Sequence, residues 1–168
     1  MLQLFVYGTL KLGFWNHDRY CKGVVLIEEA EVLGRLFALA GGEPLLDVPP
    51  SLVLAEGTLD PRGDALLQRE EARNISEDDL ADPEGPLHMP EYGWGAVKGE
   101  ILHFNDPLLR LPSMDRLEGY CPGVRGAYRR LLYPARSAGR VLPVWLYAGA
   151  PEAVTGARLA LRSGKWPS

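Results

Sequence analysis

The sequence predicts a small α+β domain in which a curled mixed sheet or β-barrel packs against one or two flanking helices. Short runs rich in β-forming residues recur along the chain and are mostly joined by turn signals, as in hairpin-linked strands. Helix signals are confined to a few segments. A chain of 168 residues, of which 46% are hydrophobic and 24% charged, is long enough for one domain with its own core.

The N-terminal part is predicted to form strands separated by turns. The first strand ends at Gly8-Thr9, and Asn16 is placed to cap a short turn or helix. Gly34 is a candidate β-bulge, and Gly41-Gly42-Glu43-Pro44 is a turn signal. The strands predicted here are Leu2–Val6, Val24–Ile27, Glu31–Leu39 and Ser51–Leu59.

Residues 61–96 differ in composition from the rest of the chain, because they carry nine acidic side chains against three arginines. One short helix is predicted here, Asp64–Arg73, with Asp64 as its N-cap. The remainder is predicted to be a long surface loop, and such loops in a compact domain usually serve a function. We therefore interpret residues 61–96 as an acidic insertion within a single domain spanning residues 1–168.

The C-terminal part returns to regular structure, beginning with a strand at Val97–Phe104. Asp106-Pro107 then provides an N-cap and a first helical residue for a helix that runs to about Leu117. Pro112 predicts an interruption or a restart of that helix. Two late strands are predicted at Ala127–Tyr133 and Val141–Tyr147, and a turn at residues 137–139 joins them.

Composition argues against several functional classes. The formal net charge of −4 gives no support to a nucleic-acid or anionic-membrane partner. No apolar run approaches the roughly 20 residues that span a bilayer. The N-terminus lacks the basic flank and cleavage site of a signal peptide, so we expect a cytoplasmic protein with free thiols. Two cysteines and three histidines show no metal-ligand spacing, so we expect no metal.

Three stretches together carry a family resemblance. The first is Phe5-Val6-Tyr7-Gly8-Thr9-Leu10, followed by Asn16-His17. The second consists of Gly99-Glu100-Ile101-Leu102, Asn105-Asp106-Pro107 and Met114-Asp115-Arg116-Leu117-Glu118-Gly119-Tyr120. The third consists of Tyr128-x-Arg130, Val144-Trp145-Leu146-Tyr147 and Ser163-Gly164-Lys165-Trp166. In this order and spacing they resemble the γ-glutamylcyclotransferase-like (AIG2-like) family over residues 1–60 and 97–168, and residues 61–96 are unmatched.

The resemblance implies the γ-glutamylcyclotransferase-like fold and an enzyme that uses no metal or organic cofactor. In such enzymes the α-amine of a γ-glutamyl amide attacks the substrate's own γ-carbonyl, and 5-oxoproline and an amine are released. The α-amine must first lose a proton and the departing amine must gain one. A single carboxylate can do both if its pKa lies near the working pH, and Glu118 is the candidate for this general acid/base. Because an ordinary glutamate titrates near about 4.3, Glu118 needs desolvation, which a helix end flanked by Leu117 and Tyr120 favours.

The resemblance also indicates substrate-binding residues. The loop Tyr7-Gly8-Thr9-Leu10 offers backbone N–H groups to either the oxyanion of the reaction or the substrate's α-carboxylate, and the sequence leaves both roles open. Tyr128 and Tyr147 are further candidates through their hydroxyls, although buried tyrosines often bind a local partner instead. Asn16 is expected to brace the loop, and Arg130 either pairs with a carboxylate or lies in solvent.

Other interpretations remain open at this stage. A non-catalytic small-molecule-binding module on the same fold is the main alternative, and an interaction domain that uses residues 61–96 as a contact surface is another. A thiol nucleophile at Cys21 or Cys121 beside His17 lacks an orienting third group. The acidic run 77–84 lacks the ligand spacing of a calcium loop. We expect a small γ-glutamyl compound as the partner, and the sequence identifies neither its amine half nor the oligomeric state.

Overall fold

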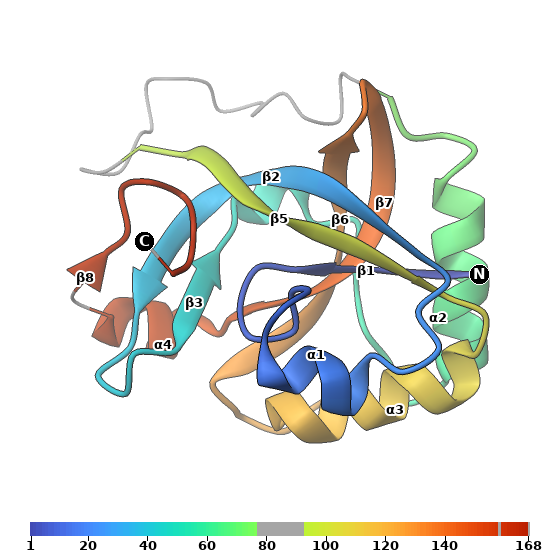
Figure 1. Cartoon of the computed structure of the whole chain (residues 1–168), viewed down its shortest axis with the longest axis horizontal. Helices are drawn as coiled ribbons and strands as arrows, with labels where there is room; N and C mark the ends of the chain where they lie inside the picture. The colour runs from blue at the N-terminus through green and yellow to red at the C-terminus, as the bar shows by residue number, and fades with distance from the viewer. Residues whose placement is uncertain (77–92, 158, 168) are drawn as a thin grey trace.

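The computed structural model describes residues 1–76, 93–157 and 159–167, and Figure 1 shows a strongly curved sheet flanked by helices. The strands in this part of the chain are β1 (Leu2–Val6), β2 (Leu26–Ala38), β3 (Pro44–Asp47), β4 (Ala55–Glu56), β5 (Gly95–Phe104), β6 (Tyr128–Ser137), β7 (Arg140–Gly149) and β8 (Leu159–Ala160). The helices are α1 (Trp15–Tyr20), α2 (Pro61–Glu71), α3 (Pro107–Glu118) and α4 (Pro151–Gly156), with a 3₁₀ turn at Pro50–Leu52. None of the described helices is long and apolar enough to cross a bilayer.

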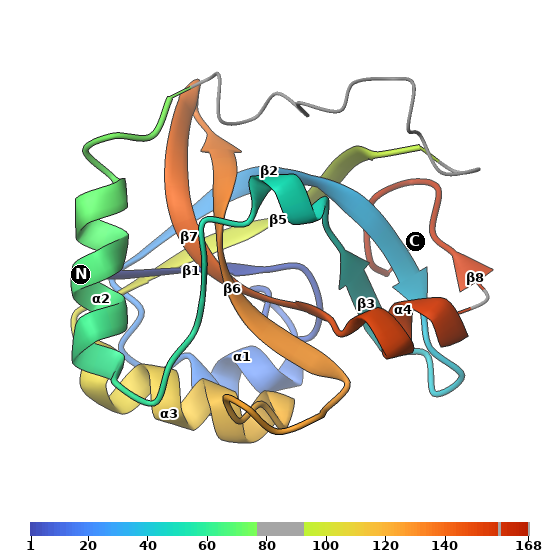
Figure 2. The same cartoon turned by 180° about the vertical axis from the view of Figure 1, so that it is seen from behind.

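Five of the strands close into a mixed barrel. β1 is antiparallel to β5 and parallel to β7, while β2 pairs with β5 and β6 with β7. The ring closes where β2 meets β6, with Glu31 opposite Arg136. β3 and β8 add to β2, and β4 adds to β6. The predicted α+β class with a small barrel is therefore confirmed, and Figure 2 shows the same arrangement from behind.

β1 is buried on both faces, which places its end between two cores. Leu2 and Leu4 pack with Leu111 and Met114 of α3, outside the barrel. Phe5 packs into the barrel interior with side chains of β2, β5, β6 and β7. This alternation follows from the two-residue period of a strand. The loop that follows β1 consequently lies where the barrel interior meets α3.

α3 begins at Asp106-Pro107 as predicted, but the predicted interruption at Pro112 is wrong. Proline removes the helical donor from the carbonyl of residue 108, and Leu108 is 45% exposed, so water can donate to that carbonyl instead. The helix ends at Gly119, which adopts a left-handed φ of 64°, and the N–H of Tyr120 donates to the carbonyl of Asp115 at 2.8 Å. Glu118 is therefore the last helical residue.

The predicted strands Val24–Ile27 and Glu31–Leu39 are parts of one strand, because β2 runs without a break from Leu26 to Ala38. The intervening glutamates pair in register with β5. Gly34 also pairs in register with Gly95, so it is not a bulge. A Cβ on Gly34 would lie 2.7 Å from the carbonyl oxygen of Asp47, so close packing against β3 requires the glycine.

Two predictions between residues 41 and 59 need correction. The turn predicted at residues 41–44 ends in β3, a strand that the sequence analysis missed and that starts at Pro44 itself. The strand predicted at Ser51–Leu59 is wrong except for Ala55–Glu56, because Pro50–Leu52 form a 3₁₀ turn.

The helix predicted at Asp64–Arg73 starts earlier, at Pro61. Its N-cap is Asp60, whose side chain accepts a hydrogen bond from the N–H of Arg62, so the prediction of Asp64 as N-cap is wrong. Gln68 of this helix donates to backbone carbonyls of Gln3 and Pro143 at 2.8 and 2.9 Å, which fixes α2 against the barrel. Residues 77–92 of the predicted surface loop lie outside the described residues.

Candidate active site

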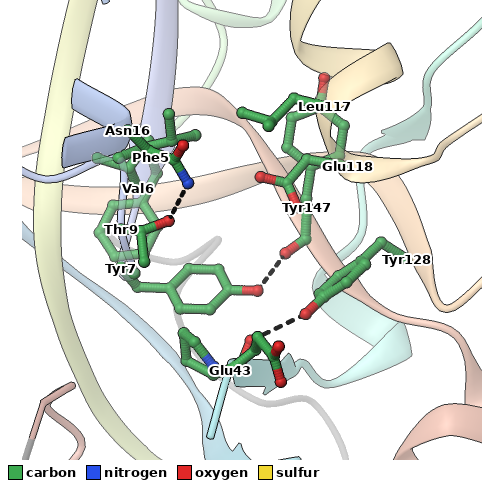
Figure 3. Close-up of a pocket in the computed structure, with 13 residues that line it drawn as sticks. Phe5, Val6, Tyr7, Thr9, Asn16, Glu43, Leu117, Glu118, Tyr128 and Tyr147 are labelled. Carbon is green, nitrogen blue, oxygen red and sulfur yellow. Dashed lines mark hydrogen bonds between the residues drawn. The ribbon is translucent and has the colours of Figure 1, made fainter. Parts of the chain in front are cut away.

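A cavity of about 250 Å³ opens where the loop after β1, the end of α3 and the turn before β3 meet. Figure 3 shows the side chains that surround it. All seven predicted site residues line this one cavity: Glu118, Tyr7, Gly8, Thr9, Leu10, Tyr128 and Tyr147. The remaining lining residues are Phe5, Val6, Asn16, Glu43, Pro44 and Leu117. The fold thus brings together predicted site residues that are up to 140 positions apart in the sequence, Tyr7 and Tyr147.

The loop after β1 is held from two sides. Asn16 braces it, as expected, by donating from Nδ2 to Thr9 Oγ1 at 2.7 Å, and it does not cap α1, whose N-cap is Phe14. A Cβ on Gly8 would lie 2.8 Å from Pro44 Cγ, so glycine is required by this close approach. Among the described residues, the N–H groups of Gly8, Thr9 and Leu10 find no protein acceptor. These three donors are therefore open to a ligand.

Glu118 projects into the cavity from the last turn of α3 (Figure 3). Its carboxyl group has no hydrogen-bond or ion-pair partner in the part of the chain that the structure describes. Burial raises the pKa of Glu118 to about 7 from its ordinary value near 4.5. The predicted desolvation is thus present, and both protonation states are populated near neutral pH. The group can accept a proton and return it.

Three tyrosines form the walls. Tyr7 donates its hydroxyl proton to the backbone carbonyl of Tyr147 at 2.7 Å, and Tyr128 donates to the carbonyl of Pro44 at 3.1 Å (Figure 3). The hydroxyl of Tyr147 donates to Asp115 Oδ1 at 2.7 Å. Burial is the main cause that raises the pKa of Tyr128 to about 12, and it holds the pKa of Tyr7 and Tyr147 well above 10. The rings are therefore neutral, and a ligand would meet their hydroxyl oxygens as acceptors.

A buried ion-pair network centred on Arg130 adjoins the cavity through Tyr147, whose hydroxyl donates to Asp115. Arg130 is 1% exposed, so it does not lie in solvent. Of the two environments predicted for it, the structure shows pairing with carboxylates. Its Nη2 lies 2.6 Å from Asp64 Oδ2, and its Nε lies 3.3 Å from Asp115 Oδ1. Burial raises the pKa of Asp115, against the lowering effects of the Tyr147 hydrogen bond and of Arg130. The network connects α2, β6 and α3.

Sequence analysis missed Glu43 and Pro44 as cavity residues. Glu43 directly precedes β3 and Pro44 is its first residue, and they reach the cavity only because β3 pairs with β2. No local signal distinguishes them from an ordinary turn. These two residues could be predicted only with the knowledge that β3 pairs with β2.

A thiol nucleophile finds no support in the geometry, and the acidic run 77–84 lies outside the described residues. Burial raises the pKa of the Cys21 thiol to about 12, so it is a poor source of thiolate, and Cys121 does not line the cavity. Within the described ranges no group of three or more His, Cys, Asp or Glu side chains is arranged to hold a metal ion.

A family model described as gamma-glutamyl cyclotransferase, AIG2-like, matches residues 57–168, which is more than half of the chain. The matched range includes Glu118, Tyr128 and Tyr147 as well as residues 61–96, and it does not include residues 7–10. A search of curated proteins with this sequence found no match.

Two solved structures are similar to this chain. One is YkqA from Bacillus subtilis, with a TM-score of 0.54 and 17% identity over 98% of this chain and 39% of that protein. The other is an AIG2-like protein from Mus musculus, with a TM-score of 0.48 and 20% identity over 92% of this chain and 82% of that one. This chain thus spans about two fifths of the length of the Bacillus protein, and the similarity between them is one of fold.

Proposed function

The chain belongs to the gamma-glutamyl cyclotransferase, AIG2-like family, and we propose that it is an enzyme that cyclises a γ-glutamyl amide to 5-oxoproline and releases an amine. The observation that carries the proposal is the carboxyl group of Glu118. It lines a cavity and has no partner among the described residues, and its pKa of about 7 suits a group that must both take and give a proton.

Glu118 acts first as a base. It removes a proton from the substrate's α-ammonium, and the freed amine attacks the γ-carbonyl carbon, so that a C–N bond forms and the carbonyl oxygen becomes an oxyanion. Glu118 then donates this proton to the departing nitrogen while the original amide C–N bond breaks and the carbonyl re-forms. The ring nitrogen loses its second proton through Glu118 to the released amine, which leaves as an ammonium ion, and Glu118 is again a carboxylate. One molecule of substrate gives one molecule of 5-oxoproline and one of amine. No water, metal or organic cofactor takes part in this balance.

The loop after β1 supplies the charge-stabilising donors. The open N–H groups of Gly8, Thr9 and Leu10 can stabilise the developing oxyanion or hold the substrate's α-carboxylate. Backbone donors suit both tasks, because they are fixed before the reaction and need no rearrangement. Tyr7, Tyr128 and Tyr147 would shape the cavity around the glutamyl group. The cytoplasm remains the location that we propose.

A product screen tests the proposal. We would incubate the purified protein with γ-glutamyl amino acids, γ-glutamyl amines and glutathione, and measure 5-oxoproline by mass spectrometry. Glu118→Gln keeps the shape of the side chain and removes the base, so we expect turnover to fall by about 10²–10⁴-fold. Glu70→Gln, the same change on the exposed face of α2, is the matched control and should retain wild-type turnover.

Two outcomes would contradict the proposal. A folded Glu118→Gln variant with wild-type turnover would exclude Glu118 as the base. A ligand of the panel that raises the melting temperature but is not consumed would favour the non-catalytic binding module.

A further inference from the structure

The cavity carries negative charge without compensation. Of the described residues that line it, only Glu43 and Glu118 have carboxyl side chains, and none is a lysine, arginine or histidine. Glu118 is partly protonated near pH 7, whereas Glu43 is exposed to solvent. The carboxylate of Glu43 has no cationic partner among the described residues, unlike the exposed Glu56, which pairs with Arg129 at 2.8 Å. Glu43 is therefore an unpaired charge at the cavity.

The backbone around Glu43 is fixed on both sides. Within the hairpin, the N–H of Leu39 donates to the carbonyl of Glu43 and the N–H of Gly42 donates to the carbonyl of Leu39, both at 2.9 Å. The indole N–H of Trp166 donates to the carbonyl of Gly42 at 3.0 Å. On the other side, the hydroxyl of Tyr128 donates to the carbonyl of Pro44. The backbone of Glu43 is consequently held at a defined place beside the cavity.

That place lies away from Glu118. Figure 3 shows the rings of Tyr7 and Tyr128 between the two carboxyl groups. Glu43 and Glu118 both contribute to the raised pKa of Tyr128. Of these two carboxylates, only Glu118 contributes to the raised pKa values of Tyr7 and Tyr147. Tyr128 is thus the neighbour that the two acids share.

The reaction requires the α-amine and the γ-carbonyl to lie near Glu118 and the loop after β1. The amine half is attached to the γ-carbonyl, so it lies farther from the α-amine in another part of the cavity. An amine half that leaves past Tyr128 reaches the side of the cavity on which Glu43 stands. A positive charge on that half would be attracted by Glu43, and a negative charge would be repelled.

On this basis, and resting on the proposed function, we propose that Glu43 is a specificity-determining residue that selects γ-glutamyl amides whose amine half carries a positive charge beyond the amide bond. The attraction is modest because Glu43 is exposed to water. It acts on the choice of substrate and not on the chemical step, so kcat changes little and KM changes most.

The test uses three γ-glutamyl amides of equal chain length, whose amine halves end in an ammonium, a methyl or a carboxylate group. For the wild type we expect kcat/KM to be about 2–5-fold higher for the ammonium than for the methyl compound, and lower again for the carboxylate compound. Glu43→Gln should bring the three values close together, and Glu43→Lys should reverse their order. Glu70→Gln should keep the wild-type order, and higher salt should reduce the differences.

The design separates this inference from the proposed function. If 5-oxoproline forms but Glu43→Gln keeps the wild-type order of substrates, the role of Glu43 is wrong and the reaction stands. If no 5-oxoproline forms, the proposed reaction is wrong. The specificity role of Glu43 is then tested by the dissociation constants of the same three compounds for wild type and Glu43→Gln. Equal affinities in that measurement would overturn the inference, and a preference for the ammonium compound that Glu43→Gln abolishes would support it.

Discussion

At the residue scale, Glu118 and Asp115 show two ways in which one helix holds a buried carboxyl group. Asp115 has partners, since the hydroxyl of Tyr147 and the guanidinium of Arg130 both lower its pKa, although burial outweighs them. Glu118, one turn later, has only burial, which raises its pKa to about 7. A carboxyl group kept near Tyr7 and Tyr128 without a partner destabilises the folded protein once it ionises.

This arrangement predicts how the stability of a Glu118→Gln variant depends on pH. The folded protein keeps the proton on Glu118 up to about pH 7, whereas the unfolded chain loses it near 4.5. Between these values the folded state binds more protons, so raising the pH lowers the wild-type free energy of unfolding. Glutamine has no such loss, so relative to wild type the variant should gain on the order of 3 kcal/mol between pH 4 and pH 8.

Urea denaturation at both pH values, with Glu70→Gln as the control, measures this difference. A Glu118→Gln variant whose stability relative to wild type is the same at pH 4 and at pH 8 would show that Glu118 ionises normally in the folded protein.

The sequence predicted those site residues that belong to a recognisable motif. Glu118 and the loop Tyr7-Gly8-Thr9-Leu10 belong to such motifs, and they line one cavity with Tyr128 and Tyr147, while their roles stay predictions. Glu43 could not be found in this way. Its position depends on the pairing of β3 with β2 and on the contact of Trp166 with Gly42, which involve residues far apart in the sequence.

At the element scale, one buried arginine joins three elements around the site. Arg130 of β6 pairs with Asp64 of α2 and with Asp115 of α3, and both Arg130 and Asp64 are at most 2% exposed. Asp64 also accepts hydrogen bonds from the N–H and the hydroxyl of Thr58, at 2.9 and 2.8 Å. The charges of Asp64 and Arg130 neutralise each other inside the protein. Removing one of the two side chains therefore leaves the other as a buried charge without its neutralising group.

We therefore expect Asp64→Asn to lower the free energy of unfolding by about 3 kcal/mol. The control is Glu56→Gln, which breaks an ion pair with Arg129, the residue next to Arg130 on β6. That pair is exposed, with side chains that are 47% and 38% accessible, so its loss should cost less than about 1 kcal/mol. Chemical denaturation measures both values, and equal effects of the two substitutions would contradict the importance of the buried pair.

The elements themselves were predictable to the extent that their signals were local. β1, β5 and the start of α3 follow from short runs and from Asp106-Pro107. Asp60-Pro61 is the same signal, and it marks the start of α2 in place of the predicted Asp64. Asp64 does not cap the helix. Its side chain belongs to the ion-pair network inside the protein. β3 was hidden because a turn signal and the first residue of the strand share Pro44. An edge strand tolerates proline at that position.

At the scale of the whole molecule, the C-terminal segment joins parts of the chain that surround the cavity. The indole ring of Trp166 lies 5.5 Å from the ring of Phe14, which follows the loop after β1. The indole N–H donates to the carbonyl of Gly42 in the turn that carries Glu43, and Lys11 donates to the backbone carbonyl of Trp166. The segment is also fixed to β5 through the N–H of Lys98 and the carbonyl of residue 164, at 2.7 Å. Two walls of the cavity thus depend on one residue near the end of the chain.

These contacts predict that Trp166→Ala lowers stability and activity together. The lost packing of a partly buried indole should reduce the free energy of unfolding by about 1–3 kcal/mol. The loop after β1 and the turn before β3 would also lose their common support, so kcat/KM for 5-oxoproline formation should fall. Trp166→Phe keeps an aromatic ring against Phe14 and loses only the hydrogen bond to Gly42, so it should cost about 1 kcal/mol.

Trp15→Ala is the matched control, because the side chain of Trp15 on α1 is 65% exposed and its loss should change stability by less than about 0.5 kcal/mol. Thermal unfolding and initial rates for the three variants separate the effects. If Trp166→Ala destabilised the protein no more than Trp15→Ala, the C-terminal segment would not support the cavity. If it destabilised the protein but left kcat/KM unchanged at a temperature where the variant is folded, its support would be limited to stability. If kcat/KM falls in Trp166→Ala but is largely retained in Trp166→Phe, the packing of an aromatic ring on Phe14, and not the indole N–H, is the contact that supports the cavity.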